Sequence, residues 1–185
     1  MQNPIDQDKS ELFRILKLKA FSRGHFILSS GKTSDFYLDA RLVTLSAAGA
    51  YLTARIMLDM IGQDKVDAIG GPTLGADPMV GAIASLSHQA GRPIDTFIIR
   101  KQPKAHGKQQ QVEGPLLKEG SSVVIIDDVA TTGKAFVESI EVLQKMNIKI
   151  KKAICVIDRQ EGAREALAQY NVPLDPIFTI AEFLK

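Results

Sequence analysis

The chain has one cysteine, no tryptophan and almost no net charge. The single cysteine, Cys155, cannot form a disulfide within the chain, which is typical of a protein of a reducing cytoplasm. Because Cys155 lies in an apolar run with nothing nearby to lower its pKa, we expect a buried core residue. Lys and Arg number 23 against 21 Asp and Glu. The resulting charge of +2 does not argue for nucleic acid, so any anion site must be a local cluster.

Long hydrophobic runs are also missing. No stretch approaches the ~18 apolar residues of a membrane span. Residues 1–11 are polar and lack the apolar core of a signal peptide. With 185 residues, of which 45% are hydrophobic, the chain is long enough for one domain with a proper core and short for two. We therefore expect one cytoplasmic domain over residues 1–185, without a membrane or nucleic acid partner.

Short apolar runs alternate with amphipathic segments along the chain. The pattern predicts strands at 26–28, 36–38, 66–70, 96–99, 123–126 and 153–157. It predicts helices at 76–89, 134–146 and 163–170, with two earlier helices capped by Ser10 and Ser46. This alternation is typical of an α/β fold with a mainly parallel, doubly wound sheet flanked by helices. Ligands bind such sheets beyond the carboxyl ends of the strands, so functional residues are expected there.

The segment Val123–Phe136 carries the strongest functional signal. An apolar run is followed by Asp127 and Asp128, then by a loop of small residues and the start of a helix. The loop N–H groups, the hydroxyls of Thr131 and Thr132 and the helix N-terminus together predict a phosphate cradle. The carboxylates suit vicinal hydroxyls, so the ligand is a sugar phosphate. An Asp pair that only caps the helix is the alternative, although capping needs one carboxylate.

The sequence DDVATTG at 127–133 closely resembles the phosphoribosyl pyrophosphate (PRPP) signature of type I phosphoribosyltransferases. The resemblance implies that Asp127 and Asp128 bind the ribose hydroxyls, with Asp128 also assigned to catalysis. The implied phosphate-binding residues are Val129, Ala130, Thr131, Thr132, Gly133, Lys134 and Ala135. The family fold adds a small N-terminal hood, over about residues 1–45, that helps to bind the base. It also implies Mg²⁺ that is carried by PRPP and has no direct protein ligand.

Residues 101–120 show neither clean periodicity nor an apolar face, and so long a stretch is usually a functional lid or disordered. Basic groups gather where it begins, at Arg100, Lys101, Lys104 and His106. A solvated charge run is the alternative, but lid cations can neutralise a leaving pyrophosphate while the closed lid excludes water. The run resembles the flexible loop of orotate phosphoribosyltransferases. That resemblance implies that all four residues bind PRPP, that Lys104 and His106 are catalytic, and that the loop serves the neighbouring subunit of a homodimer.

The hood segment resembles the base site of the same family. Residues 26–39, with Ser29, Ser34, Tyr37 and Asp39, match its pattern, which implies that Ser29 and Tyr37 contact orotate. Many members carry Lys where this chain has Ser29, and a simple β-turn is the alternative explanation of the spacing.

A segment near the C-terminus, DRQEGA at 158–163, also resembles the orotate family. The resemblance implies that Arg159 binds the orotate carboxylate, with Thr131 near the ring. A planar guanidinium suits a carboxylate through two parallel hydrogen bonds. The alternative is an arginine that only pairs with Asp158 or Glu161 at a helix start.

Residues 70–78 correspond to a family loop near the pyrophosphate. Many members carry Tyr-Lys where this chain has Leu74-Gly75, so we expect backbone N–H groups to replace that side chain. Four matching segments in one order favour an orotate phosphoribosyltransferase, a pentosyltransferase of pyrimidine (UMP) biosynthesis. The alternatives are a purine (adenine) phosphoribosyltransferase, or a non-catalytic RNA-binding regulator on the same fold.

Overall fold

The computed structural model describes residues 3–27, 33–102 and 111–185. Its main sheet has six strands in the order β5-β4-β3-β6-β7-β8. The strands are β3 (Ala68–Pro72), β4 (Asp95–Ile99), β5 (Val112–Glu113), β6 (Ser122–Ala130), β7 (Lys149–Asp158) and β8 (Leu174–Thr179). All neighbours are parallel except β5, which runs antiparallel to β4 at one edge. The predicted mainly parallel sheet is therefore present.

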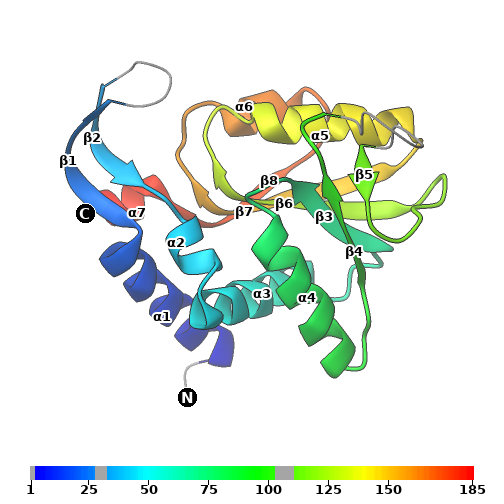
Figure 1. Cartoon of the computed structure of the whole chain (residues 1–185), viewed down its shortest axis with the longest axis horizontal. Helices are drawn as coiled ribbons and strands as arrows, with labels where there is room; N and C mark the ends of the chain where they lie inside the picture. Colours follow the sequence, from blue (N-terminus) through cyan, green and yellow to red (C-terminus); the bar gives the residue numbers. More distant parts are fainter. Residues whose placement is uncertain (1–2, 28–32, 103–110) are drawn as a thin grey trace.

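Helices cover both faces of this sheet (Figure 1). One face packs against α1 (Pro4–Lys19), α3 (Ala47–Ile61) and α4 (Asp77–Gln89), and the other against α5 (Lys134–Lys145) and α6 (Ala163–Ala168). Strand β6 shows why its sequence is an unbroken apolar run. Val124 and Ile126 belong to the core on the first face, whereas Val123 and Ile125 belong to the core on the second. Burial on both faces removes the usual polar alternation.

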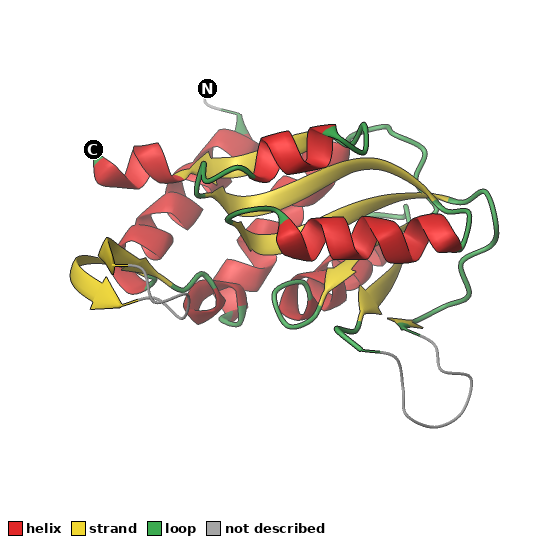
Figure 2. Cartoon of the chain, turned by 90° about the horizontal axis from the view of Figure 1, so that it is seen from above, coloured by secondary structure: helices red, strands yellow, loops and turns green. Residues whose placement is uncertain are grey.

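A separate antiparallel hairpin, β1 (Phe21–Ile27) and β2 (Thr33–Leu38), leads into the short helix α2 (Arg41–Thr44). Figure 2 shows this hairpin at one end of the molecule, beside the layered sheet. Aromatic contacts fix it there, since the ring of Phe21 lies 5.8 Å from Phe36 and 5.7 Å from Phe183 of α7 (Ile180–Leu184). The N- and C-terminal segments therefore jointly hold the hairpin beside the sheet.

Two helix caps were predicted from the sequence, and one is wrong. The helix assigned to Ser10 begins at Pro4, where the Asn3 side chain accepts a hydrogen bond from the N–H of Ile5 at 3.2 Å. Proline is favoured in the first helical turn, which the periodicity argument overlooked. Ser10 lies inside the helix and donates its hydroxyl to the carbonyl of Asp6. Ser46 caps α3 as predicted, accepting from the N–H of Gly49 at 3.2 Å.

The sequence pattern missed four short elements: α2, β5, β8 and α7. Strand β8 contains Pro176, and proline in a sequence argues against a strand because it has no N–H to donate. Strand β8 is an edge strand, where proline is tolerated. Strand β5 has two residues and lies inside the segment expected to be a lid or disordered. None of the helices in the described ranges has the length and apolar character to span a bilayer.

Candidate active site

The two carboxylates of the predicted sugar site lie within β6 rather than after it. The strand extends to Ala130 because β7 is also longer than its apolar run and pairs with β6 as far as Ala130 and Asp158. Strand β3 pairs with β6 only up to Gly70 and Ile125. Asp127 and Asp128 therefore lie beyond the last β3 partner, at the carboxyl edge where α/β sheets bind ligands.

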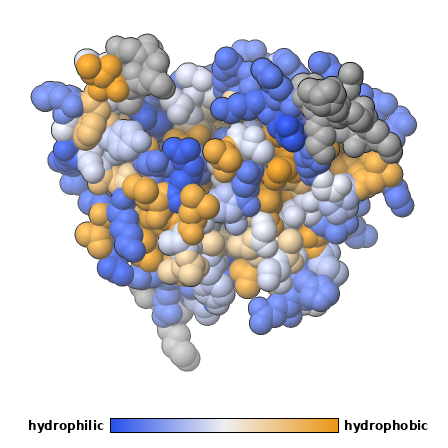
Figure 3. All heavy atoms as spheres, viewed as in Figure 1, coloured by the Kyte–Doolittle hydropathy of each residue, from blue (hydrophilic) through white to orange (hydrophobic). Residues whose placement is uncertain are grey.

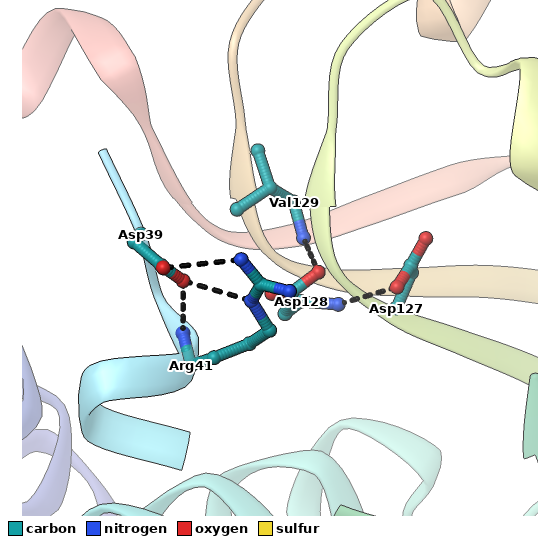
Figure 4. A network of polar contacts seen from close by, with 5 residues as sticks. All are labelled: Asp39, Arg41, Asp127, Asp128 and Val129. Atoms are coloured by element: carbon teal, nitrogen blue, oxygen red, sulfur yellow. Dashed lines mark hydrogen bonds and ion pairs between the residues drawn. The ribbon is translucent and has the colours of Figure 1, made fainter. Parts of the chain in front are cut away.

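Asp127 and Asp128 are held by the backbone that follows them. Asp127 Oδ1 accepts the N–H of Asp128 at 2.9 Å, and Asp128 Oδ1 accepts the N–H of Val129 at 2.8 Å (Figure 4). Burial raises the pKa of Asp127 well above its ordinary range, and the charge of Asp128 raises it further. Burial also raises the pKa of Asp128, but the nearby guanidinium of Arg41 opposes that rise. The pair concentrates negative charge, which favours hydroxyl donors or cations as its partners.

The loop after β3 approaches this pair closely. A Cβ atom added to Gly75 would overlap the Oδ1 atoms of both Asp127 and Asp128, so only glycine fits there. The peptide between Thr73 and Leu74 is cis. The N–H of Thr73 donates to the carbonyl of Ile99 at 3.0 Å, and within the described residues the N–H groups of Leu74 and Gly75 have no hydrogen-bond partner. The N–H groups of Leu74 and Gly75 therefore fit the predicted backbone contact with the pyrophosphate.

The predicted phosphate cradle is a concavity of about 110 Å³ at the end of β6. Its lining comprises Asp127, Val129, Ala130, Thr131, Thr132, Gly133, Lys134, Ala135 and Phe136. Gly133 adopts a left-handed conformation, with φ of 80°, directly before the first residue of α5. This turn aims the helix N-terminus at the concavity, where the helix dipole and free N–H groups favour an anion.

A second cavity, of about 500 Å³, lies between the hairpin and the carboxylate pair. Its lining residues are Leu38, Asp39, Ala40, Arg41, Thr73, Leu74, Gly75, Lys101, Asp128, Val129, Thr131 and Arg159. Thr131 and Arg159, both expected to contact the base, are thus brought to one cavity with Asp128. It adjoins a third cavity of about 430 Å³, which Thr73, Gly75, Lys101 and Asp128 also line. The predicted sugar site and base site are therefore continuous.

Arg159 is fixed by three different partners. Its backbone N–H donates to the carbonyl of Ala130 at 2.8 Å, and its Nε donates to Glu161 at 2.8 Å. Its guanidinium lies 4.8 Å from the centre of the Phe36 ring, and only 10% of the side chain is exposed. The sequence analysis had considered an Arg159 that only pairs with Asp158 or Glu161, and the pairing with Glu161 is present. Asp158 does not pair with Arg159, and instead accepts from Arg164 and from the backbone of Gln160.

Sequence reasoning chose Tyr37 in the hairpin, but Phe36 is the residue that contacts Arg159. Side chains alternate across a strand, so Phe36 and Tyr37 point to opposite faces of the hairpin. Tyr37 packs against the ring of Phe26 at 5.6 Å and is 44% exposed. Side chains alternate along a strand, so the sequence could have identified Phe36 if the face of the hairpin that points to the cavity had been known.

Sequence reasoning also missed Arg41. Its Nε and Nη2 donate to Asp39 Oδ1 at 2.9 Å and Oδ2 at 3.1 Å, and its backbone N–H donates to Oδ1 at 3.1 Å (Figure 4). These three bonds hold the pKa of Asp39 below its ordinary range. Figure 4 shows the guanidinium between Asp39 and the carboxylate pair of β6. An isolated Arg at the start of a four-residue helix carries no motif that would have revealed this position.

The predicted lid is described only at its two ends. Arg100 follows β4 and pairs with Glu113 of β5 at 3.4 Å, and Lys101 lines both the 430 Å³ and the 500 Å³ cavity. Lys104 and His106 lie outside the described residues, as does Ser29 of the hairpin. Within the described ranges, no group of three or more His, Cys, Asp or Glu side chains could hold a metal ion.

Comparison with known families agrees with this geometry. Residues 44–182 match the model of the phosphoribosyl transferase domain, so the chain belongs to the phosphoribosyltransferase family and is an enzyme of that class. Its type I fold, predicted from the sequence, is confirmed. A more particular assignment comes from individual relatives. The orotate phosphoribosyltransferase of Synechocystis sp. is 38% identical over 179 residues, which cover 97% of this chain and 90% of the relative.

That of Aquifex aeolicus is 37% identical, covering 96% of this chain and 98% of the relative. A crystal structure of orotate phosphoribosyltransferase from Mycobacterium tuberculosis H37Rv superposes with a TM-score of 0.83 at 33% identity, covering 95% and 98% of the two chains. Another structure of that enzyme, in complex with PRPP, has a TM-score of 0.80 at 29% identity, covering 96% and 99%. Within the phosphoribosyltransferases, the chain belongs to the orotate phosphoribosyltransferases.

Proposed function

We propose that this chain transfers ribose 5-phosphate from PRPP to orotate, giving orotidine 5′-phosphate and pyrophosphate in pyrimidine biosynthesis. The observation that carries the proposal is the position of the carboxylate pair, the buried Asp127 and the partly buried Asp128. It lies between a phosphate-sized concavity on one side and the cavity of Arg159 on the other. This arrangement provides neighbouring places for a sugar phosphate and for a base that bears a carboxylate.

PRPP binds with its ribose hydroxyls on Asp127 and Asp128 and its 5-phosphate in the concavity of residues 129–135. Carboxylates are strong hydrogen-bond acceptors, and the ribose hydroxyls supply donors in addition to the one backbone N–H that each carboxylate accepts. Mg²⁺ would be held by the diphosphate oxygens of PRPP and by water, since it keeps several waters and prefers the oxygens of substrate phosphates. We assign no magnesium ligand to the protein.

Orotate places its carboxylate on Arg159 and its ring beside Thr131, with lesser contacts assigned to Tyr37 and Ser29. The bond to Glu161 uses one of the five guanidinium N–H donors of Arg159, so the others are left for a carboxylate. Stacking on Phe36 orients the plane of the guanidinium before the substrate arrives. Such preorganisation favours a planar, anionic base over adenine.

In the chemical step, the anomeric carbon loses pyrophosphate through an oxocarbenium-like state and the orotate ring nitrogen adds from the opposite face. The proton of that nitrogen leaves to the departing pyrophosphate or to solvent. No protein nucleophile is needed, since positioning and charge stabilisation carry the reaction. Arg100, Lys101, Lys104 and His106 neutralise the charge that develops on the diphosphate. The assignment of Lys104 and His106 rests on the sequence alone.

The working form is proposed to be a cytoplasmic homodimer, in which the 101–120 loop of one copy serves the site of the other. Support comes from three exposed leucines, Leu42, Leu45 and Leu74, whose side chains are 58%, 71% and 66% accessible. They line an apolar groove of about 600 Å³ directly beside the substrate cavity. Exposed apolar patches of this kind mark interaction surfaces, and a second copy is the simplest partner for a symmetric dimer.

The purified chain should be given PRPP and Mg²⁺ with either orotate or adenine while pyrophosphate release is measured. We expect turnover with orotate only. In Arg159→Gln, the KM for orotate should rise about 10-fold or more, because a hydrogen bond to a charged group is lost. The KM for PRPP should not change, and Arg14→Gln, on the exposed face of α1, serves as the matched control. Turnover with adenine, or RNA binding without turnover, would contradict the proposal.

A further inference from the structure

The pair formed by Asp39 and Arg41 lies at the substrate cavity, but none of the roles assigned so far uses it. Asp39 is largely buried, with 18% of its side chain exposed, whereas 47% of the Arg41 side chain is exposed. Both residues line the 500 Å³ cavity and the apolar groove beside it. A buried carboxylate thus anchors a guanidinium that remains open to ligand.

The geometry of the pair leaves donors free for such a ligand. Asp39 engages Nε and one N–H of Nη2 of Arg41. A guanidinium has five N–H donors, so three remain for an anion. Because Asp39 already fixes the orientation of the side chain, little further rotamer entropy is lost on binding. Arg41 is therefore prepared to recognise phosphate through two parallel hydrogen bonds.

The surroundings indicate which anion Arg41 meets. It shares two cavities with Leu74, and the loop Thr73–Gly75 contributes no cationic side chain to this side of the site. On the side of Arg41 away from Asp39 lie Asp128 and then Asp127 (Figure 4), and their negative charge opposes the approach of a diphosphate. An anion on this side needs a fixed positive charge, and Arg41 lies beside both the loop and the carboxylates.

Arg159 lines the same cavity but belongs to a different set of contacts. It is held by Phe36 and Glu161, and its backbone is bonded to the end of β6. The base attacks and the diphosphate leaves on opposite faces of the ribose. Two separate cationic groups are therefore expected, one for the base carboxylate and one for the leaving group. Arg159 fits the first role, and Arg41 adds a fixed charge for the second beside Lys101, which lines the same cavity.

We propose that Arg41, oriented by Asp39, binds the diphosphate group of PRPP and of the pyrophosphate product. This inference rests on the proposed function. It adds to that function a residue that supplies positive charge where the loop at Leu74 and Gly75 has none.

The test compares the wild-type chain with Arg41→Gln, Arg41→Lys, Arg159→Gln and the control Arg14→Gln, all with Mg²⁺. Binding of inorganic pyrophosphate is measured by calorimetry, and KM values for PRPP and orotate are measured separately. Arg41→Gln should weaken pyrophosphate binding and raise the KM for PRPP about 10-fold or more, with little change for orotate. Arg41→Lys should recover part of the loss, because it restores the charge without the two-pronged geometry.

The role of Arg41 is overturned if Arg41→Gln binds pyrophosphate as the wild type does, or if the KM for orotate rises more than that for PRPP. Circular dichroism and a melting curve check the fold. If Arg41→Gln unfolds, the folded variant Arg41→Lys decides instead. Pyrophosphate affinity equal to that of the wild type overturns the proposed pair of hydrogen bonds from Arg41, and a weaker affinity supports it. Absence of orotate turnover in the wild type would refute the proposed function instead, while the calorimetry on the same proteins still decides the role of Arg41.

Discussion

Replacing Asp127 with asparagine should stabilise the protein while it impairs the enzyme. Asp127 is 8% exposed, and its charge faces the charge of Asp128 without a cation beside it among the described residues. Asparagine keeps the oxygen that accepts the N–H of Asp128 and removes the buried charge. Relief of an uncompensated buried group contributes about 1–3 kcal/mol. For a domain of this size, each kcal/mol raises Tm by about 2–4 °C.

The sign of the pH dependence follows from the raised pKa of Asp127. The folded state binds this proton more tightly than the unfolded state, whose carboxyl titrates near the ordinary value of 3.8. Stability from this group therefore falls as pH rises from about 3.8 through the raised folded pKa. The advantage of Asp127→Asn should be largest above that pKa and should shrink as the wild-type carboxyl becomes protonated at lower pH.

The difference in stability between the wild type and Asp127→Asn is measured by melting curves from acidic to mildly alkaline pH, without PRPP in the buffer. Asp39→Asn is a control of opposite sign, because Arg41 lowers the pKa of Asp39. That carboxylate stabilises the fold above its ordinary pKa, and its contribution is lost as pH falls through the lowered folded pKa. A Tm for Asp127→Asn at or below wild type near pH 8, with native circular dichroism, would refute the reasoning. The same variant should lose PRPP affinity, since one hydroxyl acceptor is weakened.

Three further outcomes are expected. Lys104→Ala should lower kcat far more than it weakens PRPP binding, and an unchanged kcat in rapid-quench assays would remove the lid role. Gly75→Ala should raise the KM for PRPP about 10-fold or more and lower Tm, because the added methyl displaces the carboxylates of Asp127 and Asp128; wild-type values for both would contradict this close approach. Cys155 is fully buried and burial raises its thiol pKa, so the folded chain should not react with a thiol reagent until denaturant is added.

Several features of the fold were accessible from the sequence because they depend on local patterns. The apolar runs at 123–126 and 153–157 identified strands buried on both faces, and Ser46 marked a helix start by its hydroxyl alone. Local patterns failed where tertiary contacts decide. Strand β6 continues through two aspartates because β7 continues beside it, and β8 accommodates Pro176 because it is an edge strand of the sheet in the described part of the chain.

The sequence alone predicted the sugar-phosphate site, since one continuous segment, 127–135, contains both carboxylates and the residues of the predicted cradle. A strand, a turn and a helix N-terminus that follow each other in the chain need no distant partner to come together. The rest of the cavity is assembled from segments far apart. Arg41, Gly75 and Arg159 meet at Asp128 only because the hairpin is anchored by Phe183 and the β3 and β7 strands flank β6. Sequence spacing carries no record of such contacts, so only the tertiary structure could reveal the charge of Arg41 beside the carboxylate pair.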